Sequence, residues 1–415
     1  MRTEPPPCDD AAAHRGHCPG RGWLTPNLRT LSGVSFLQDA ASELLYPVLP
    51  IFLTVTRGAP VAVVGIVEGV AEGVAAVTKL LAGRLGDTWA RRPLIAVGYG
   101  LAAVGKVLVA LAVVWPVVLA GRAVDRVGRG IRGAPRDALL VVGADPAARG
   151  RIFGFHRAAD TAGAVVGPAV GLGLYELLGH QVRPLLVVAV VPAVLSVLLV
   201  RAVHEEHRPG PGRAAGSRRT RAPVARPTAL PPRLRSLIAT LGVFGLVNFP
   251  DALLLLWASQ LGLSLGGVIS AYIACNTVHA LAAHPLGAVS DRVPRHLVFA
   301  TGLGFFAVGY LGLVHSPGWV FLLLPLYGFF AAATDGVGKA WVADLAPTDR
   351  TSGAQGFHQA VTGGAVLVAG TWAGLAWNTT GTLPLLVSGT AAAALAVAVV
   401  CVGGRFAPAP DVARP

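Results

Sequence analysis

The chain has 415 residues, of which 53% are hydrophobic and 13% are charged, and its formal net charge is +13. Soluble domains carry roughly 25% charged residues, so this composition excludes an ordinary soluble protein and indicates a membrane protein. The sequence shows no Walker loop, nucleophile elbow or zinc-hydrolase spacing, and no basic domain interleaved with aromatic residues. We therefore expect neither an enzyme, a nucleotide-driven pump nor a nucleic-acid-binding protein, and no cofactor.

Apolar windows long enough to cross a bilayer as helices recur from Leu31 to Gly403. They predict about twelve transmembrane helices. The expected spans are 31–56, 60–84, 93–115, 117–142, 152–178, 184–203, 236–262, 266–290, 297–315, 318–343, 354–377 and 382–403.

A linker rich in proline, glycine and arginine, residues 204–235, separates the spans into two groups of six. The predicted organisation is a tail at 1–30, a six-helix bundle at 31–203, the linker at 204–235, a second six-helix bundle at 236–403 and a tail at 404–415.

Arginines cluster in the loops that would share a side with the two termini: Arg84, Arg91, Arg92, Arg149, Arg151, Arg292, Arg295, Arg350 and Arg405. The opposite loops carry little beyond Arg57 and Arg183. By the positive-inside rule the linker and both termini are expected to be cytoplasmic. We expect a multi-pass monomer in the inner membrane, surrounded by the lipid bilayer.

The two halves repeat one another, at an offset of 204 residues in one stretch and 202 in another. Gly83, Asp87, Arg91, Gly98 and Gly105 pair with Gly287, Asp291, Arg295, Gly302 and Gly309, and the Gly-Phe-His triplet at 154–156 recurs at 356–358. Two halves of like orientation form a parallel repeat, which is typical of transporters that rock around a site between their halves.

The loop GRLGDTWARR, residues 83–92, resembles the signature loop of the major facilitator superfamily, and GAVSDRVPRH, residues 287–296, resembles its second copy. The resemblance implies an all-α integral membrane protein with twelve transmembrane helices in two six-helix bundles. Gating is assigned to the loop residues Gly83, Asp87, Arg91, Arg92, Asp291 and Arg295. The pattern Gly163-x-x-x-Gly167-Pro168 resembles a motif associated with antiporters in this superfamily, and these residues join the gating set.

The span 117–142 carries an unusual charged face. On a helix, Arg122, Asp125, Arg126, Arg129, Arg132, Arg136 and Asp137 fall within an arc of about 140°. An unpaired charge at the bilayer centre costs at least about 2.5–3.5 kcal/mol, so these groups require partners or water. Of the lower members, Arg132 to Asp137, we expect Arg136 and Asp137, beyond the helix-disturbing Pro135, to reach the cytoplasmic surface. Arg122 and Arg126 fall nearer the outer half and are expected to stay inside.

Other spans supply acidic partners. Because a buried carboxyl is held protonated and a nearby arginine ionises it, these positions suit proton coupling. The predicted proton carriers are Asp39, Glu43, Glu68, Glu72 and Asp160, and the predicted ion-pair network is Lys79, Arg129, Asp335 and Lys339. The alternative for each carrier is a permanent salt bridge to Arg126, Arg129 or Lys79. The resemblance also implies that the first, fourth, seventh and tenth spans line a central cavity.

Substrate binding is assigned to cavity positions: Arg122, Arg126, Asn248, Asp251, Trp257, Tyr272 and Asn276. Two arginines could clamp an anion, and Trp257 with Tyr272 could form an aromatic wall, although either aromatic could instead pack in the core. Cys275 and His279 could face a soft metal or could be a buried thiol and a hydrogen-bonded histidine, and we predict no metal site.

The function predicted from these features is proton-coupled transport of a small molecule, in the direction of export. The alternatives are an importer of a nutrient, metal or metal chelate, and a membrane receptor or scaffold that transports nothing.

Overall fold

A computed structural model describes residues 23–45, 61–142, 144–179, 181–205, 230–377 and 381–406. For residues 45, 61–73, 76, 182, 252, 259 and 265 it describes the backbone alone. The described chain is almost entirely helical and contains no strand, which confirms the predicted all-α fold.

The helices of the first half are α2 (Pro26–Leu45), α4 (Val61–Thr88), α5 (Arg91–Leu111), α6 (Trp115–Leu140), α7 (Arg149–Leu177), α8 (Val182–Val188) and α9 (Val190–Val200). Those of the second half are α10 (Pro232–Gly245), α11 (Asp251–Gln260), α12 (Leu265–Ser290), α13 (Arg295–His315), α14 (Val320–Leu345), α15 (Thr351–Leu375) and α16 (Thr382–Val402). Short 3₁₀ turns are η2 (Pro146–Ala148), η3 (Pro317–Trp319), η4 (Thr348–Arg350) and η5 (Gly403–Phe406).

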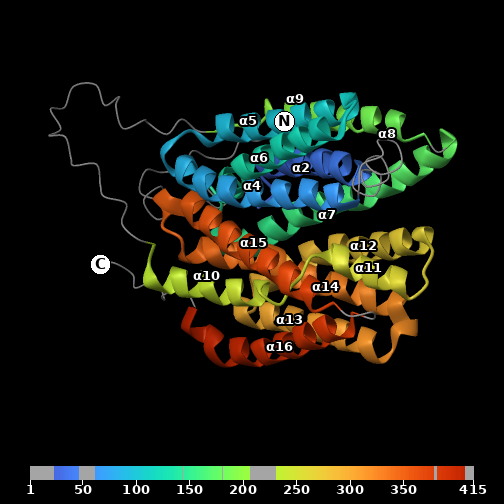
Figure 1. The fold of residues 1–415 in the computed structure, drawn as a ribbon. Coiled ribbons are helices and arrows are strands. Elements are labelled where there is room, and N and C mark those ends of the chain that lie inside the picture. Colours follow the sequence, from blue (N-terminus) through green and yellow to red (C-terminus); the bar gives the residue numbers. More distant parts are fainter. Residues whose placement is uncertain are drawn as a thin grey trace, which may run out of the picture.

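The helices of each half lie together, one half above the other in Figure 1, and successive spans run antiparallel. The connections at 89–90, 141–142, 144–148, 291–294 and 346–350 all lie at the end of the molecule where α9 ends and α10 begins, on either side of the predicted linker. We call this the linker end. The described residues at 178–179, 261–264, 316–319 and 376–377 lie at the opposite end.

Prolines explain where two predicted spans break. Pro192 has no N–H to bond the Val188 carbonyl, and the sixth span divides there into α8 and α9. Pro250 disfavours helical geometry at the preceding residue, and the seventh span opens between α10 and α11. Pro135 behaves otherwise, because α6 continues through it to Leu140.

The expectation that Arg136 and Asp137 reach the cytoplasmic surface is wrong. Because α6 passes through Pro135 without ending, both side chains remain inside the bundle, and they are 8% and 0% exposed. Charge at these positions therefore needs partners from neighbouring helices.

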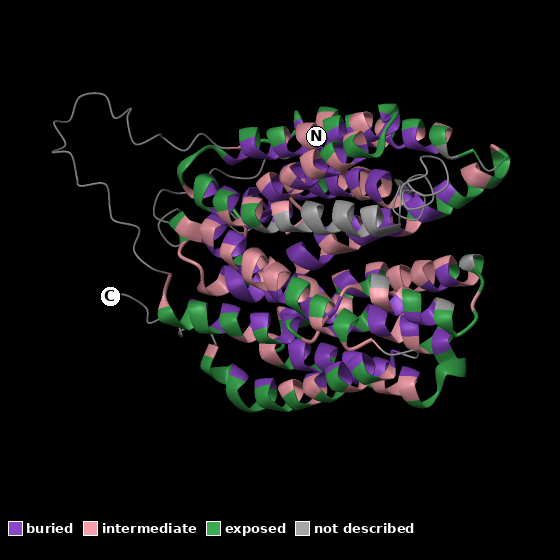
Figure 2. Cartoon of the chain, viewed as in Figure 1, coloured by how far each residue is buried: buried purple, intermediate pink, exposed green. Residues whose placement is uncertain are grey.

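Burial follows the halves: buried residues face the inside of each bundle and exposed residues lie on its outer surface (Figure 2). By length and apolar composition alone, six described segments could each span a membrane: 91–111, 183–200, 266–290, 295–315, 317–345 and 382–406. Helix α6 falls outside this set because of its arginines, and the seventh span because it is divided.

Candidate functional site

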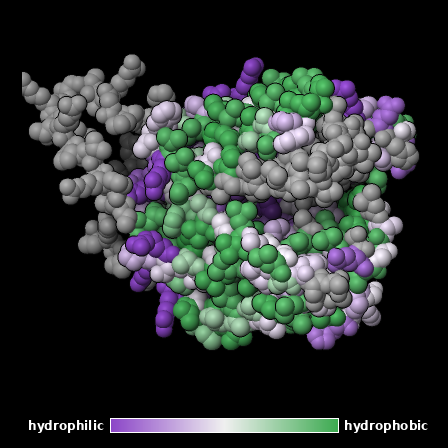
Figure 3. Space-filling view, viewed as in Figure 1, coloured by the Kyte–Doolittle hydropathy of each residue, from purple (hydrophilic) through white to green (hydrophobic). Residues whose placement is uncertain are grey.

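A cavity of about 750 Å³ lies between the two halves. Helices α4, α6 and α7 of the first half and α10, α13, α14 and α15 of the second contribute to its lining. Figure 3 shows hydrophilic atoms deep in the seam, surrounded by hydrophobic surface. Its volume lies within the range of about 300–1,000 Å³ that is usual for small-molecule sites.

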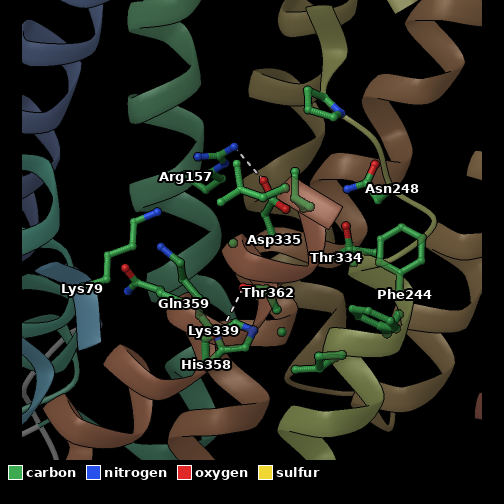
Figure 4. A pocket seen from close by; sticks show the side chains of 18 of the residues that line it. Lys79, Arg157, Phe244, Asn248, Thr334, Asp335, Lys339, His358, Gln359 and Thr362 are labelled. Atoms are coloured by element: carbon green, nitrogen blue, oxygen red, sulfur yellow. Dashed lines mark hydrogen bonds and ion pairs between the residues drawn. The ribbon is translucent and has the colours of Figure 1, made fainter. Parts of the chain in front are cut away.

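Arg157 of α7 links the two halves beside this cavity. Its Nη2 lies 2.6 Å from Oδ2 of Asp335 on α14, and its Nη1 lies 3.0 Å from Oδ2 of Asp160 on its own helix. Figure 4 shows the Arg157 guanidinium pointing across the seam to Asp335. Arg157 thus bridges two carboxylates, one from each half.

Asp137 of α6 anchors a second bridge between the halves, and it is fully buried. Its Oδ2 accepts from Lys339 Nζ of α14 at 2.8 Å and from Gln359 Nε2 of α15 at 3.0 Å. Its Oδ1 accepts from Arg136 at 3.2 Å. The buried carboxylate of Asp137 is tolerated because Lys339, Gln359 and Arg136 all donate hydrogen bonds to it.

The predicted proton carriers of α2 lie beside these charges. Asp39 lies within hydrogen-bonding reach of Asp160, and the arginines Arg129 and Arg132 attract its carboxylate. Glu43 lies beside Arg129, and its Oε2 accepts from Tyr272 Oη of α12 at 3.2 Å. Two carboxyl groups in contact resist ionising together, so the pair formed by Asp39 and Asp160 is suited to holding a proton.

The first signature loop closes the halves at the linker end. Asp87 Oδ2 accepts from the Gly353 N–H at the start of α15 at 2.9 Å, and Arg91 Nε donates to Ser352 Oγ at 3.1 Å. Gly83 faces Gly356, where an added Cβ would lie 2.8 Å from the Gly356 Cα. A carboxylate at a helix N-terminus is favoured by the unpaired N–H groups and the helix dipole.

The second signature loop makes the matching contact. Asp291 accepts from the Gly150 and Arg151 N–H groups at the start of α7, at 2.6 and 2.9 Å. Arg295 donates to Asp291 and to Asp344, and Asp344 also pairs with Arg149. Burial raises the pKa of Asp291, so these donors are needed to keep its carboxylate ionised.

The predicted gating glycines of α7 hold this helix against α2. An added Cβ at Gly163 would meet the Phe36 carbonyl oxygen, and one at Gly167 would lie 2.6 Å from the Ala40 carbonyl oxygen. Pro168 lies inside α7 without ending it. Small residues at such contacts let membrane helices approach closely. Arg92 is exposed at the start of α5, where its N–H donates to Glu205.

The predicted substrate residues fall in three places. Arg126 and Asn248 line the cavity. Arg122 is buried in α6 but is not among the lining residues, and Asp251 accepts from Tyr327 Oη at 2.8 Å.

Trp257 is 2% exposed in the apolar core of the second half. On α12, Tyr272 bonds Glu43 instead of facing the cavity, and Asn276 donates to the Tyr272 carbonyl. Trp257 therefore matches the alternative of core packing, whereas Tyr272 makes a hydrogen bond between the two halves.

Among the predicted network residues, Lys79, Asp335 and Lys339 line the cavity, and Arg129 is half-buried near Asp39. Asp335 and Lys339, which are one turn apart, each pair with the opposite half. Glu68 and Glu72 lie in the part of α4 where only the backbone is described, so their side chains fall outside the description.

Cys275 and His279, the possible metal-binding pair, have surroundings that do not suit a metal ion. His279 Nε2 lies 3.4 Å from Arg157 Nε, so a guanidinium occupies its open side and would repel a metal cation. Cys275 is half-buried on the same helix. Among the described residues, no group of three or more histidine, cysteine or acidic side chains could hold a metal ion.

Sequence reasoning missed Arg157, Gln359, Ser352 and Asp344 as site residues. Arg157 carried a usable signal, because it is an arginine inside an apolar span and such groups are rarely without a role. Gln359, Ser352 and Asp344 become important only through the helices that they face. No spacing in the sequence shows those contacts.

Comparison with known proteins identifies the family. The sequence model described as "Major Facilitator Superfamily" matches residues 31–279. An uncharacterised MFS-type transporter of Methanocaldococcus jannaschii is 29% identical over 364 residues, covering 86% of this chain and 89% of that protein. An uncharacterised protein of Mycobacterium tuberculosis is 36% identical over 153 residues, covering 35% of this chain and 37% of that protein.

Solved structures agree in fold. A bacterial homologue of the iron transporter ferroportin, in an outward-facing state, superposes with a TM-score of 0.71 at 16% identity, covering 92% of this chain and all of that one. The fucose:proton symporter of E. coli gives a TM-score of 0.66 at 15% identity, covering 91% and 99%. The human organic anion transporter MFSD10 gives 0.67 at 16% identity, covering 92% and 100%.

At these identities the likeness shows the fold alone. The family match covers more than half of the chain. The repeated loops, the helical fold and the cavity between the halves agree with it. The chain belongs to the Major Facilitator Superfamily and is a membrane transporter, not an enzyme.

Proposed function

We propose that this transporter is a proton-coupled antiporter that exports a small molecule by alternating access. The linker end, which carries the basic loops, would face the cytoplasm of the inner membrane, and the monomer would be the working unit. The two six-helix bundles, 31–203 and 236–403, would be the rocking bodies.

The observation that carries the proposal is the position of Arg157. It is bound to Asp160, which contacts Asp39, and also to Asp335 of the other half. A proton arriving at the pair formed by Asp39 and Asp160 removes one of the charges that hold the guanidinium. The hold of the first half on the second therefore depends on protonation, which is the requirement for coupling.

The closed linker end gives the cycle a starting point. Both signature loops are bonded across the seam, and we infer from this that the cavity is closed on the proposed cytoplasmic side. A proton from outside would then load the carboxyl pair first, and opening of the linker end would release it inside and admit the cargo. Export follows from this order, and the resemblance of the α7 glycine pattern to an antiporter motif supports the same direction.

The test is flux in proteoliposomes under an imposed pH gradient, with a panel of labelled anionic, zwitterionic and cationic compounds and a lumenal pH dye. We expect gradient-driven flux of at least one compound with matching proton movement, abolished in Asp160→Asn. Asp349→Asn is the control, because this carboxylate is exposed outside the cavity. An absence of gradient-dependent flux across the panel, together with an unresponsive dye, would favour a scaffold.

A further inference from the structure

Three rings meet across the seam beside the second signature loop. Trp23 precedes α2, Phe155 lies on α7, and His284 lies on α12 of the second half. The Trp23 indole stacks on the His284 imidazole, with ring centroids 5.1 Å apart and planes at 21°. The Phe155 ring stands nearly at right angles to both, with its centroid 5.8 Å from Trp23 and 5.9 Å from His284. Two of these three ring contacts therefore join the two halves.

The segment that carries Trp23 is fixed to the first half. Thr25 Oγ1 accepts from the Leu28 N–H at 3.1 Å and so caps the start of α2. The Asn27 side chain exchanges two hydrogen bonds with the backbone of His204, at 2.6 and 2.9 Å, just beyond the end of α9. Both contacts lie within the first half and at its linker end, so Trp23 moves with this half.

His284 lies where the two halves are in close contact. Helices α7 and α12 run side by side across the seam (Figure 1). A Cβ added at Gly154 would lie 3.2 Å from the His284 Cα, closer than ordinary van der Waals contact. The Arg151 guanidinium lies 5.6 Å from the centre of the Trp23 ring, and the Arg151 N–H donates to Asp291 of the second signature loop. The ring cluster is thus part of the same closed contact as that loop.

A contact that exists in one conformation only shifts the balance between conformations. A stacked ring pair at this separation favours the state that contains it by roughly 2- to 13-fold, beyond the effect of the apolar area that it buries. Because Trp23 moves with the first half and His284 with the second, this contribution belongs to the closed linker end and is lost when the end opens.

We propose that Trp23 and His284 form a clasp that holds the linker end closed. The segment ahead of α2 is then a working part of the gate, in addition to the two signature loops. When the halves rock, the Trp23 and Phe155 rings leave His284 together, and the stack forms again on closure. The inference rests on the alternating access of the proposed function, but it does not depend on proton coupling or on the cargo.

A buried thiol measures how often the linker end opens. Ser352 is 0% exposed and lies in the contact of the first signature loop, away from the clasp. In a chain whose native cysteines are serine, the alkylation rate of Ser352→Cys by N-ethylmaleimide follows the population of open molecules. Ser196→Cys, which is equally buried but lies inside the first half, reports general loosening of the fold. Both rates are measured on the full chain without cargo or pH gradient.

Trp23→Ala should raise the alkylation rate of Ser352→Cys by roughly 2- to 13-fold and leave that of Ser196→Cys unchanged. Trp23→Phe keeps a ring and should stay within about twofold of the parent chain. Trp319→Ala is the matched control, because Trp319 is 63% exposed at the opposite end. Equal acceleration at both thiols in Trp23→Ala would reduce Trp23 to a stabilising residue and overturn the clasp, as would an unchanged rate at Ser352→Cys.

His284→Ala tests the other side of the stack. It should accelerate alkylation of Ser352→Cys at least as much as Trp23→Ala, because both ring contacts across the seam are lost. In the His284→Ala background, adding Trp23→Ala should change the rate by less than about twofold. Two effects that multiply fully would show that Trp23 acts without His284, and the clasp would be wrong.

The results distinguish the clasp from the proposed function. Faster alkylation in Trp23→Ala, together with an absence of gradient-driven flux in the parent chain, would keep the clasp and remove proton coupling. Gradient-driven flux with unchanged alkylation in both Trp23→Ala and His284→Ala would keep the transport function and remove the clasp.

Discussion

Gly83 offers the sharpest test of how the linker end closes. An alanine Cβ at this position would lie 2.8 Å from the Gly356 Cα and 3.0 Å from the Ser352 carbonyl oxygen. Ordinary contacts of this kind begin at 3.4 Å, so α4 and α15 must separate by about 0.6 Å. Backbone atoms form the obstacle, so no side-chain rotation can relieve it.

Overpacking of this size costs about 1–3 kcal/mol. Because the contact exists only while the linker end is closed, the cost falls on that conformation alone. The ratio of closed to open molecules should drop by roughly 5- to 150-fold in Gly83→Ala. The adjoining bond from Gly353 N–H to Asp87 lies in the same interface and should weaken with it.

Spin labels at exposed Thr88 and Asp349, in a background with every native cysteine replaced by serine, report the distance across this end by double electron–electron resonance. Gly83→Ala should broaden the distribution towards longer distances. Gly100→Ala is the matched control, since its added Cβ meets nothing within 4 Å. An unchanged distribution in Gly83→Ala, or an equal shift in Gly100→Ala, would refute the reasoning.

Three further outcomes are expected. Lys106→Met should destabilise the protein by about 3–5 kcal/mol in thermal unfolding, because buried Asp125 loses its partner at 2.9 Å, and adding Asp125→Leu should restore most of it. Asp137→Asn should likewise lower the melting temperature, because Lys339 loses its buried partner. In the double variant with Lys339→Gln, the loss of unfolding free energy should be smaller than the sum of the two single losses. Additive losses would contradict the bridge. Exchange of one proton for one neutral molecule moves one charge, worth about 2.3 kcal/mol at 100 mV, so an inside-negative potential should accelerate efflux. A potential-independent rate would exclude that stoichiometry.

The fold was predictable from the sequence for a simple physical reason. Helix length is set by the bilayer, and apolar windows with short polar turns between them have few alternative readings. The charged face of α6 was also readable, since helical spacing alone puts Arg126 and Asp137 on one side. Where the prediction was wrong, at Arg136 and Asp137, a proline was expected to disturb a helix that packing keeps continuous.

The partners of these charges could not be predicted. Asp335 and Lys339 are one turn apart, so local spacing suggests a pair, yet each bonds a residue of the other half. Trp257 was predicted to line the cavity but lies in the apolar core, whereas Phe244, which was not predicted, lines the cavity. Periodicity in the sequence shows which face of a helix is polar. Which residues that face contacts depends on how the two bundles pack against each other, and the sequence does not show this.

The two signature loops show the same limit within one molecule. Asp87 and Asp291 are repeat-related, and each caps the start of a helix in the opposite half. The arginines that follow them differ in outcome: Arg91 meets the Ser352 hydroxyl, whereas Arg295 meets the Asp344 carboxylate. Both interfaces combine charge-assisted hydrogen bonds with close glycine contact, Gly83 against Gly356 and Gly287 against Gly154, and at the second interface Asp344 also pairs with Arg149. The repeat in the sequence therefore predicts the two capping aspartates, but not the partners of the arginines that follow them, because those partners come from the opposite half.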